Sequence, residues 1–550
     1  MTSRALFAGA CIALLLRADA FPQSRVNLGT QTHFSQGWSA DVLARARLIG
    51  AGTLRDSIPW KVGEPTPGNY DFTGPAAAKL KQACASGFTL VLTEVPTHPA
   101  YDQYQTVNSP AGQAAYAHYL QALAREFGSC LIAIEVGNEI NGARAMVLPA
   151  GVDPANNYVS LLKAVKAAVK PAAPGVAILG GSTNMIGTGF LTTLFAAGML
   201  AEIDGVAVHQ YRIRAEGADL EIAHLIAVMR QSGREVPVWV TEFSIDSSDE
   251  AAAAGEALKA YVLLSAGGSA NLYWYALLDQ ASFPNMGLFN GGRLKQQGQA
   301  FTQITRELTA TGKPSRLELG DPLLFAYAFG PDRAVVWGAP RQIAIDPAVK
   351  VFSASGASID NPGKLTIGER PVLLKGATTL EPGHSAVLAD TLLGYGGPGW
   401  RYFARSPSGK DYPLSLFDDR FDSYFGGRSY KPLRIGPFSA AVAGNATSPT
   451  RALWRHVVAS PTTATIKGCL AKTVSGDGVD YEVFRNGISL IKGVATSTAT
   501  VNTGPLALAA GDQIDFAVGP NQTSGGDAFN YRFMIVEGSS ALSPECPPLR

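Results

Sequence analysis

The sequence is long and almost neutral, and both properties narrow what it can encode. It has 550 residues, of which 16% are charged, and its 45 Lys and Arg balance its 44 Asp and Glu to a net charge of +1. A chain of this length exceeds one ordinary core, so several domains are expected. The charge balance excludes the basic footprint of a nucleic-acid-binding protein, and no polybasic run indicates an anionic membrane surface.

The N-terminus has the layout of a secretory signal peptide. A basic start, Met1–Arg4, precedes the apolar run Ala5–Leu16 and a small-x-small site that ends at Ala20. This order predicts cleavage after Ala20 and a secreted or periplasmic protein, with a buried N-terminal helix as the alternative. The apolar run is too short to span a bilayer, and no other stretch is long enough, so no membrane span is expected.

Four cysteines remain once the signal peptide is removed. Cys84 and Cys130 each precede an expected strand, and Cys469 and Cys546 bracket the last β-rich region. Because export places the chain in an oxidising compartment, we predict the disulfides 84–130 and 469–546. Free buried thiols are the alternative.

Strand-like and helix-like runs alternate eight times between residues 21 and 310. The strand candidates are mostly continuous apolar runs, as is typical of parallel strands covered by helices. Ser39, Ser109 and Asp153 are candidate helix caps. This pattern predicts an α/β fold, a (β/α)8 TIM barrel over residues 21–310. The expected strands are Val26–Thr32, Gly52–Ile58, Thr89–Val95, Leu131–Val136, Val176–Gly180, Gly205–Val208, Val238–Thr241 and Asn271–Tyr275.

Short β-type runs between Gly, Pro and Asp turns replace this pattern after residue 311. They predict a small β-sandwich over residues 311–392 and a β-rich, jelly-roll-like domain over residues 393–550, with a hairpin turn at Asn486-Gly487. The last domain contains several aromatic residues. Two roles stay open for it: carbohydrate binding, or bracing of the barrel.

Polar residues follow the apolar runs where a TIM barrel builds its active site, at the C-terminal ends of the strands. A single carboxylate there is most often a structural ion-pair partner. Here two carboxylates occur together, Glu139 after strand four and Glu242 at strand seven. An Asn, a His-x-Tyr and an Arg accompany them, and together these residues form a constellation. The polar positions are His33, Arg55, Glu94, Asn138, Glu139, Asn184, His209, Tyr211, Glu242 and Asp279, with Trp274 at strand eight.

This constellation meets the chemical needs of glycosidic bond cleavage. One carboxyl must protonate the leaving oxygen, and the other must attack or stabilise the anomeric carbon. The acid needs a raised pKa while the nucleophile stays ionised. We expect Arg55 to hold Glu242 ionised, Tyr211 to donate to the same carboxylate, and Asn138 to bind a sugar hydroxyl.

The motifs around these residues resemble those of clan A glycoside hydrolases. The resemblance is carried by Ile134–Glu139 (IEVGNE) and Thr241–Phe243 (TEF), and by the strand-two segments Leu54–Trp60 and Glu64–Phe72. His209-Gln210-Tyr211 resembles the strand-six His-x-Tyr of family 39 and of related bacterial exopolysaccharide-cleaving glycosidases. The likeness covers roughly residues 25–305.

The resemblance implies a retaining enzyme that works by double displacement through a covalent glycosyl-enzyme. Glu139 would be the acid/base and Glu242 the nucleophile, with their carboxyls about 5–5.5 Å apart. The residues in supporting places would be Arg55, Asn138, His209 and Tyr211.

Aromatic residues near the strand ends are candidate platforms for sugar rings. They are Trp60, Tyr101 and Trp274, with Phe283 as a further candidate, and core packing is the alternative for each. Polar contacts are expected from His33, His98 and Asn285. Among the competing carboxylates, Glu135 is interpreted as an internal ion-pair partner and Glu94 as a lesser candidate for touching substrate.

Other chemistries lack their motifs. No H-E-x-x-H or C-x-x-C occurs, and the seven His are scattered, so neither a catalytic metal nor a cofactor is expected. The expected partner is a polysaccharide or oligosaccharide. A non-catalytic glycan-binding protein and a transglycosylase remain alternatives, and the sugar, the linkage and the oligomeric state stay open.

Overall fold

The computed structural model describes residues 25–376, 379–442, 450–523 and 527–546. The expected signal peptide and its cleavage site lie outside the described residues. Within the described part of the chain, no helix combines the length and the apolar character needed to cross a membrane.

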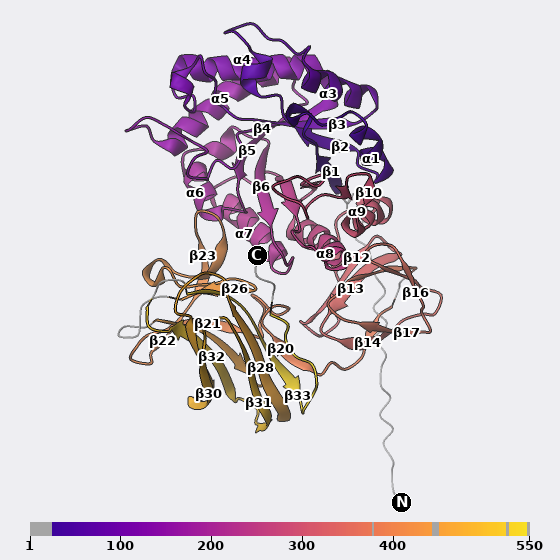
Figure 1. Ribbon diagram of the computed structural model, residues 1–550, viewed down its shortest axis with the longest axis vertical. Coiled ribbons are helices and arrows are strands. Elements are labelled where there is room, and N and C mark those ends of the chain that lie inside the picture. Colours follow the sequence, from indigo (N-terminus) through magenta and orange to yellow (C-terminus); the bar gives the residue numbers. More distant parts are fainter. Residues whose placement is uncertain (1–24, 377–378, 443–449, 524–526, 547–550) are drawn as a thin grey trace, which may run out of the picture.

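The N-terminal part is the predicted TIM barrel (Figure 1). Eight parallel strands close in chain order, because β1 pairs with both β2 and β8. The strands are β1 (Asn27–Gln31), β2 (Thr53–Asp56), β3 (Thr89–Glu94), β4 (Leu131–Val136), β5 (Ala177–Thr183), β6 (Gly205–Tyr211), β7 (Val238–Ser244) and β8 (Asn271–Trp274). The helices are α1 (Val42–Leu48), α2 (Trp60–Gly63), α3 (Pro75–Ala85), α4 (Pro110–Phe127), α5 (Pro154–Ala172), α6 (Thr188–Ala196), α7 (Ala218–Gln231), α8 (Glu250–Gly267) and α9 (Gln296–Glu307).

Local sequence accounts for several helix starts. The side chains of Ser109 and Asp153 accept hydrogen bonds from the backbone N–H of Gly112 and Asn156, so both predicted caps are confirmed. Ser39 is not the cap of α1, which begins after Asp41.

Two apolar layers form the barrel core. Inside the barrel lies a small cluster that includes Leu179, Trp239 and Tyr273. Gly29 permits this packing, because a Cβ there would lie 2.6 Å from the Tyr273 ring. A larger cluster fills the space between strands and helices. Alternate residues of a strand point to opposite layers, so strand parity decides which side chains reach the site.

Antiparallel sheets follow the barrel, as predicted. The small sandwich packs a six-stranded sheet and a three-stranded sheet around their own core. Its strands are β11 (Ser315–Arg316), β12 (Leu324–Phe329), β13 (Arg333–Gly338), β14 (Arg341–Ala344), β15 (Lys350–Ser353), β16 (Ser358–Ile359), β17 (Lys364–Ile367), β18 (Val372–Lys375) and β19 (Glu381–Pro382). A short hairpin, β9 (Phe289–Asn290) and β10 (Arg293–Leu294), precedes α9.

The C-terminal domain has an eight-stranded and a six-stranded sheet around a separate core. The hairpin turn predicted at Asn486-Gly487 joins β29 to β30, and both turn residues have positive φ. The strands are β20 (Val387–Asp390), β21 (Arg401–Arg405), β22 (Asp411–Pro413), β23 (Ser415–Asp418), β24 (Ser423–Gly426), β25 (Arg434–Ile435), β26 (Ser439–Ala441), β27 (Arg451–Val457), β28 (Thr462–Lys472), β29 (Val479–Arg485), β30 (Ile488–Ala495), β31 (Thr498–Leu508), β32 (Gln513–Pro520) and β33 (Ala528–Glu537).

The start of this domain differs from the expected residue 393. β20 lies before that boundary, yet it pairs with β33 near the end of the chain. Arg532 of β33 forms a buried ion pair with Asp390 at the end of β20. The C-terminal domain therefore begins with β20.

Both predicted disulfides are present. Cys84, near the end of α3, bonds to Cys130, which directly precedes β4. Cys469 of β28 bonds to Cys546.

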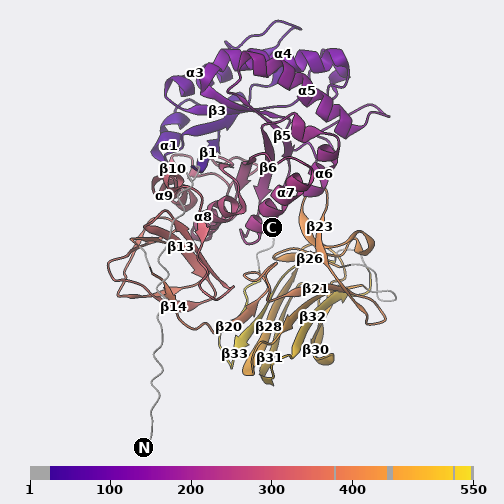
Figure 2. The ribbon, with the colours of Figure 1, turned by 180° about the vertical axis from the view of Figure 1, so that it is seen from behind.

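Charged residues join the three parts of the chain. Glu369 of the small sandwich pairs with Arg214 of the barrel at 3.1 Å and with Arg532 of the C-terminal domain at 2.8 Å. From behind, the C-terminal domain lies against the barrel near α6 and α7 (Figure 2).

Candidate active site

A buried arginine organises the floor of the site. Arg55, at the end of β2, is 1% exposed. Its Nε donates to Glu135 at 2.8 Å, its Nη1 to Gln31 at 2.8 Å and to Glu242, and its Nη2 to Asn138 at 3.0 Å. Burial acts to lower the pKa of Arg55, but Glu135 and Glu242 raise it further, so the guanidinium stays charged. The ion pair with Glu135 agrees with the internal role expected for that residue.

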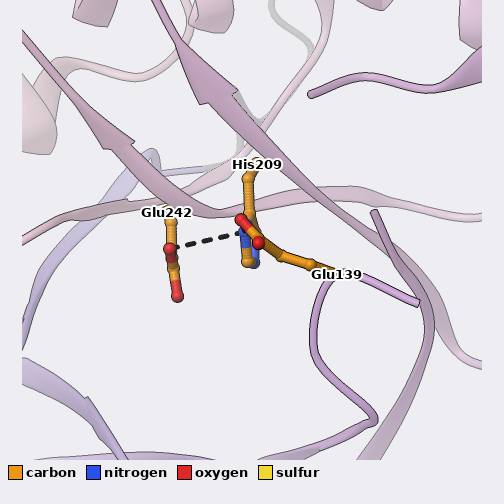
Figure 3. Close-up of side chains that lie close together, drawn as sticks. All are labelled: Glu139, His209 and Glu242. Carbon is orange, nitrogen blue, oxygen red and sulfur yellow. Dashed lines mark hydrogen bonds and ion pairs between the residues drawn. The ribbon is translucent and has the colours of Figure 1, made fainter. Parts of the chain in front are cut away.

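A buried histidine, His209, lies among three carboxylates, and Figure 3 shows it with two of them, Glu139 and Glu242. His209 Nδ1 is 3.2 Å from Glu139 Oε1 and 3.4 Å from Glu242 Oε2, and its Nε2 is 3.6 Å from Glu135 Oε1. Burial acts to lower the pKa of His209, but the three carboxylates outweigh it and raise the pKa to about 9. The imidazole is therefore a cation at neutral pH.

Glu139 and Glu242 face each other across this imidazole. One carboxylate oxygen of each lies within 4.8 Å of the other and of a His209 nitrogen. The Glu139 side chain is 34% exposed and that of Glu242 is 8% exposed. The Tyr211 hydroxyl donates to Glu242 Oε2. Glu139 therefore contacts solvent at the mouth of the barrel, while Glu242 lies deeper and accepts hydrogen bonds from Arg55 and Tyr211.

The electrostatics of Glu139 correct one expectation. A raised pKa was expected for the acid, but in this structure its pKa is lowered. Burial acts to raise the pKa of Glu139, but the hydrogen bond and charge of His209, the Asn184 side chain and the charge of Arg55 together outweigh burial. The main cause of the lowering is the charged imidazole, whose position the sequence did not reveal.

The same three residues have the donor types of a metal site, since Glu139, His209 and Glu242 each offer one ligand atom. A protonated imidazole, however, has no lone pair for a metal ion. In this structure the protonated His209 is itself the cation between the carboxylates.

A cavity of about 350 Å³ opens beside Glu242 on the β1, β2, β3 and β8 side of the barrel. Its residues are mostly polar, and such side chains can donate to and accept from a ligand rich in hydroxyl groups. They include Gln31, His33, Arg55, Trp60, Glu94, Thr97, Asn138, Glu242 and Tyr275.

Burial shifts the pKa of two of these residues toward the uncharged form. Burial is the main cause that lowers the pKa of His33 to about 4, and its ring packs edge-on against Tyr275. Burial also raises the pKa of Glu94 well above its usual value. Glu94 accepts a hydrogen bond from Ile58 N–H at 2.8 Å, while its second oxygen has no partner in the described part of the chain.

Trp274 is not the sugar platform that was expected. It is 1% exposed, packs on Phe243, and donates its indole N–H to the carbonyl of Met286. The cause is strand parity, because Tyr273 points into the barrel and Trp274 therefore points to the helix layer. Tyr275, one residue later, lines the cavity instead, and it was not among the predicted contacts.

Three other expected contacts, Trp60, His98 and Tyr101, form a cluster around Glu64. Trp60 and Tyr101 stack on each other with ring centroids 5.2 Å apart, and both donate to the Glu64 carboxylate. His98 Nε2 lies 2.8 Å from the Glu64 carbonyl oxygen. Trp60 still borders the cavity, but Tyr101 covers a face of its ring, and His98 is 3% exposed.

Asn285 also has a partner within the protein. Its Nδ2 donates to Asp246 at 2.9 Å, which links the loops that follow β8 and β7. It is not among the residues that line the cavity.

Comparisons with known proteins find glycoside hydrolases among the proteins similar to this chain. Residues 137–301, which include Glu139 and Glu242, match a family model described as a glycosyl hydrolase catalytic core. The resemblance to glycoside hydrolases is confirmed. A family 39 glycoside hydrolase from Bacteroides cellulosilyticus has a similar fold, with a TM-score of 0.55 and 18% identity over 64% of this chain and 81% of that one.

Two further proteins are similar to this chain. A β-galactosidase of Xanthomonas manihotis is 29% identical over 153 residues, which cover 22% of this chain and 26% of that protein. The chain thus spans about a quarter of the length of this relative. A family 39 β-xylosidase from Caulobacter crescentus gives a TM-score of 0.46 at 17% identity, over 67% of this chain and 98% of that one.

Proposed function

We propose that this protein is a retaining glycoside hydrolase that cleaves a polysaccharide or oligosaccharide, with Glu139 as acid/base and Glu242 as nucleophile. The observation that carries the proposal is the separation of the two carboxylates, whose facing oxygens lie within 4.8 Å. Retaining glycosidases place this pair about 5–5.5 Å apart, whereas inverting enzymes need about 6.5–9.5 Å to admit a water.

Each step has a residue in place. Glu242, oriented by hydrogen bonds from Arg55 and Tyr211, attacks the anomeric carbon as the bond to the leaving oxygen breaks. Glu139 gives its proton to that oxygen. A water then attacks the resulting glycosyl ester, Glu139 takes the proton of this water, and Glu242 is released as a carboxylate.

The lowered pKa of Glu139 describes the site without substrate. A sugar that covers the 34% of its side chain now facing solvent removes water from the carboxylate. Desolvation disfavours the charged form and raises the pKa, which is the direction that the acid step requires.

The protein is proposed to act outside the cytoplasm. The N-terminal segment has the signal-peptide layout, and the disulfides 84–130 and 469–546 suit an oxidising compartment. A polymer substrate fits that location.

Product release from a panel of polysaccharides and 4-nitrophenyl β-D-glycosides (xyloside, galactoside, mannoside and glucoside) tests the proposal. Wild type should release product from at least one member, and Glu139→Ala and Glu242→Ala should lower turnover by orders of magnitude. Glu235→Ala, at an exposed ion pair with Arg230, is the matched control. Glycan binding without release by wild type would favour the binding-protein alternative, and transfer to added sugar rather than water would favour a transglycosylase.

A further inference from the structure

One hairpin of the C-terminal domain contacts the barrel close to the candidate site. The turn between β23 and β24, residues 419–422, reaches the barrel beside α6 (Figure 1). The N–H groups of Gly187 and Gly189 donate to the carbonyls of Phe421 and Asp419, at 2.8 and 3.1 Å. A Cβ at Gly189 would lie 2.5 Å from the Asp419 oxygen. The hairpin therefore fits closely against the loop that follows β5.

The tip of the hairpin also binds the loop that follows β4. Arg420 donates its Nε to the carbonyl of Asn141, and Asn141 Nδ2 donates to the carbonyl of Arg420 at 2.9 Å. The Arg420 guanidinium lies 5.4 Å from the centre of the Phe190 ring at the start of α6. Asn141 is the second residue after Glu139.

Asn141 connects this contact to Glu139 by a second route. Its side chain accepts from the N–H of Asn184 at 2.8 Å and donates to the carbonyl of Asn184 at 2.9 Å. The Asn184 side chain in turn hydrogen-bonds to Glu139. Arg420 is thus linked to Glu139 both along the chain and through Asn184.

The backbone of Glu139 needs such support. Its φ is +49°, in the left-handed region that costs energy for any residue other than glycine. Strained backbone persists only where the surroundings impose it. The N–H of Ile140 donates to the carbonyl of Ser182 at 3.0 Å, which ties the same loop to β5.

We infer that the C-terminal domain positions the acid/base: Arg420 and Asn141 are positioning residues that hold the loop of Glu139 in its working conformation. The inference rests on the proposed function of Glu139. Of the two roles left open for this domain, the inference favours bracing of the barrel over carbohydrate binding. A detachable carbohydrate-binding module would not need to hydrogen-bond to the loop two residues from Glu139.

Leaving-group dependence tests this role. 2,4-Dinitrophenolate leaves without protonation, whereas phenolate needs the proton of Glu139. The substrates are the 2,4-dinitrophenyl and phenyl glycosides of the panel sugar that wild type cleaves fastest, compared by kcat/KM. The variants are Arg420→Ala and Asn141→Ser, with Glu139→Ala as the reference and Arg401→Ala, exposed on the same domain, as the control.

The expected result is selective. Arg420→Ala should lower kcat/KM for the phenyl glycoside by about tenfold or more, and for the dinitrophenyl glycoside by less than about twofold, since a misplaced acid affects only the first. Asn141→Ser should show the same pattern, and Arg401→Ala should match wild type on both substrates.

Equal losses on both substrates, or no loss on either, would overturn the inference. Thermal melts of each variant identify one that fails to fold, and the test then rests on the other variant. If Glu139→Ala itself retained wild-type activity on the phenyl glycoside, the proposed function would fail instead, so the two failures are distinguishable.

Discussion

Removal of the Arg55 guanidinium perturbs the most densely connected group in the site. In Arg55→Met, the carboxylates of Glu135 and Glu242 stay buried and lose their shared cation, while His209 remains beside them. Breaking a buried ion pair by removing one partner costs about 3–5 kcal/mol. At about 2–4 °C per kcal/mol for a domain the size of this barrel, the unfolding midpoint should fall by roughly 6–20 °C.

The assay is thermal unfolding at pH 7, with Arg293→Met as the control because Arg293 pairs with Glu250 at the surface. The Glu135 carboxylate contributes stability above its ordinary pKa of 4.5, since Arg55 and His209 outweigh burial and lower its pKa in the folded state. That contribution is lost as pH falls through the folded-state pKa, so the deficit of Arg55→Met should be full at pH 7 and shrink below pH 4.5. A deficit no larger than that of Arg293→Met would refute the reasoning.

Three further predictions concern stability. His209 has a folded-state pKa of about 9, above its ordinary 6.5, so its contribution to stability is full below pH 6.5 and is lost as pH rises through 9. His209→Gln should therefore melt at a lower temperature than wild type at pH 6 and at the same temperature near pH 10. Burial raises the folded-state pKa of Glu94 above its ordinary 4.5, so wild type loses stability as pH rises from 4.5 to that pKa. Glu94→Gln should therefore melt at the same temperature as wild type at pH 4 and at a higher temperature at pH 8, and a lower melting temperature at pH 8 would count against the raised pKa. Joint replacement of Cys84 and Cys130 by Ser opens a loop with a separation of 46 residues and should lower the free energy of unfolding in urea by about 4 kcal/mol. An unchanged free energy of unfolding would contradict a stabilising role for this disulfide.

The barrel and the polar ring of its mouth could be predicted because both follow local rules. Continuous apolar runs gave the eight strands, and strand ends gave Arg55, Glu139, His209 and Glu242. Trp274 was placed wrongly although the rule for it is local too. Alternation along β8 sends Trp274 to the helix layer once Tyr273 fills the barrel interior, whereas the choice of Trp274 as a platform rested on the family resemblance.

Contacts between distant segments could not be predicted from one sequence. Trp60, His98 and Tyr101 come from two different loops and all hydrogen-bond to Glu64, so their rings pack on each other instead of facing a substrate. The contact of Arg420 with Asn141 joins residues 279 positions apart. No periodicity or spacing encodes such a pair, because it depends on how two separately folded domains meet.

Azide rescue of Glu242→Ala tests the central claim most directly. The variant lacks the nucleophile but keeps Glu139, and the smaller side chain leaves room for an azide ion at the anomeric carbon. With a 2,4-dinitrophenyl glycoside of the accepted sugar, azide should restore turnover and give a glycosyl azide of inverted configuration, read by proton NMR. An azide product of retained configuration, or no rescue of a folded variant that has lost its activity, would contradict the assignment of Glu242 as nucleophile.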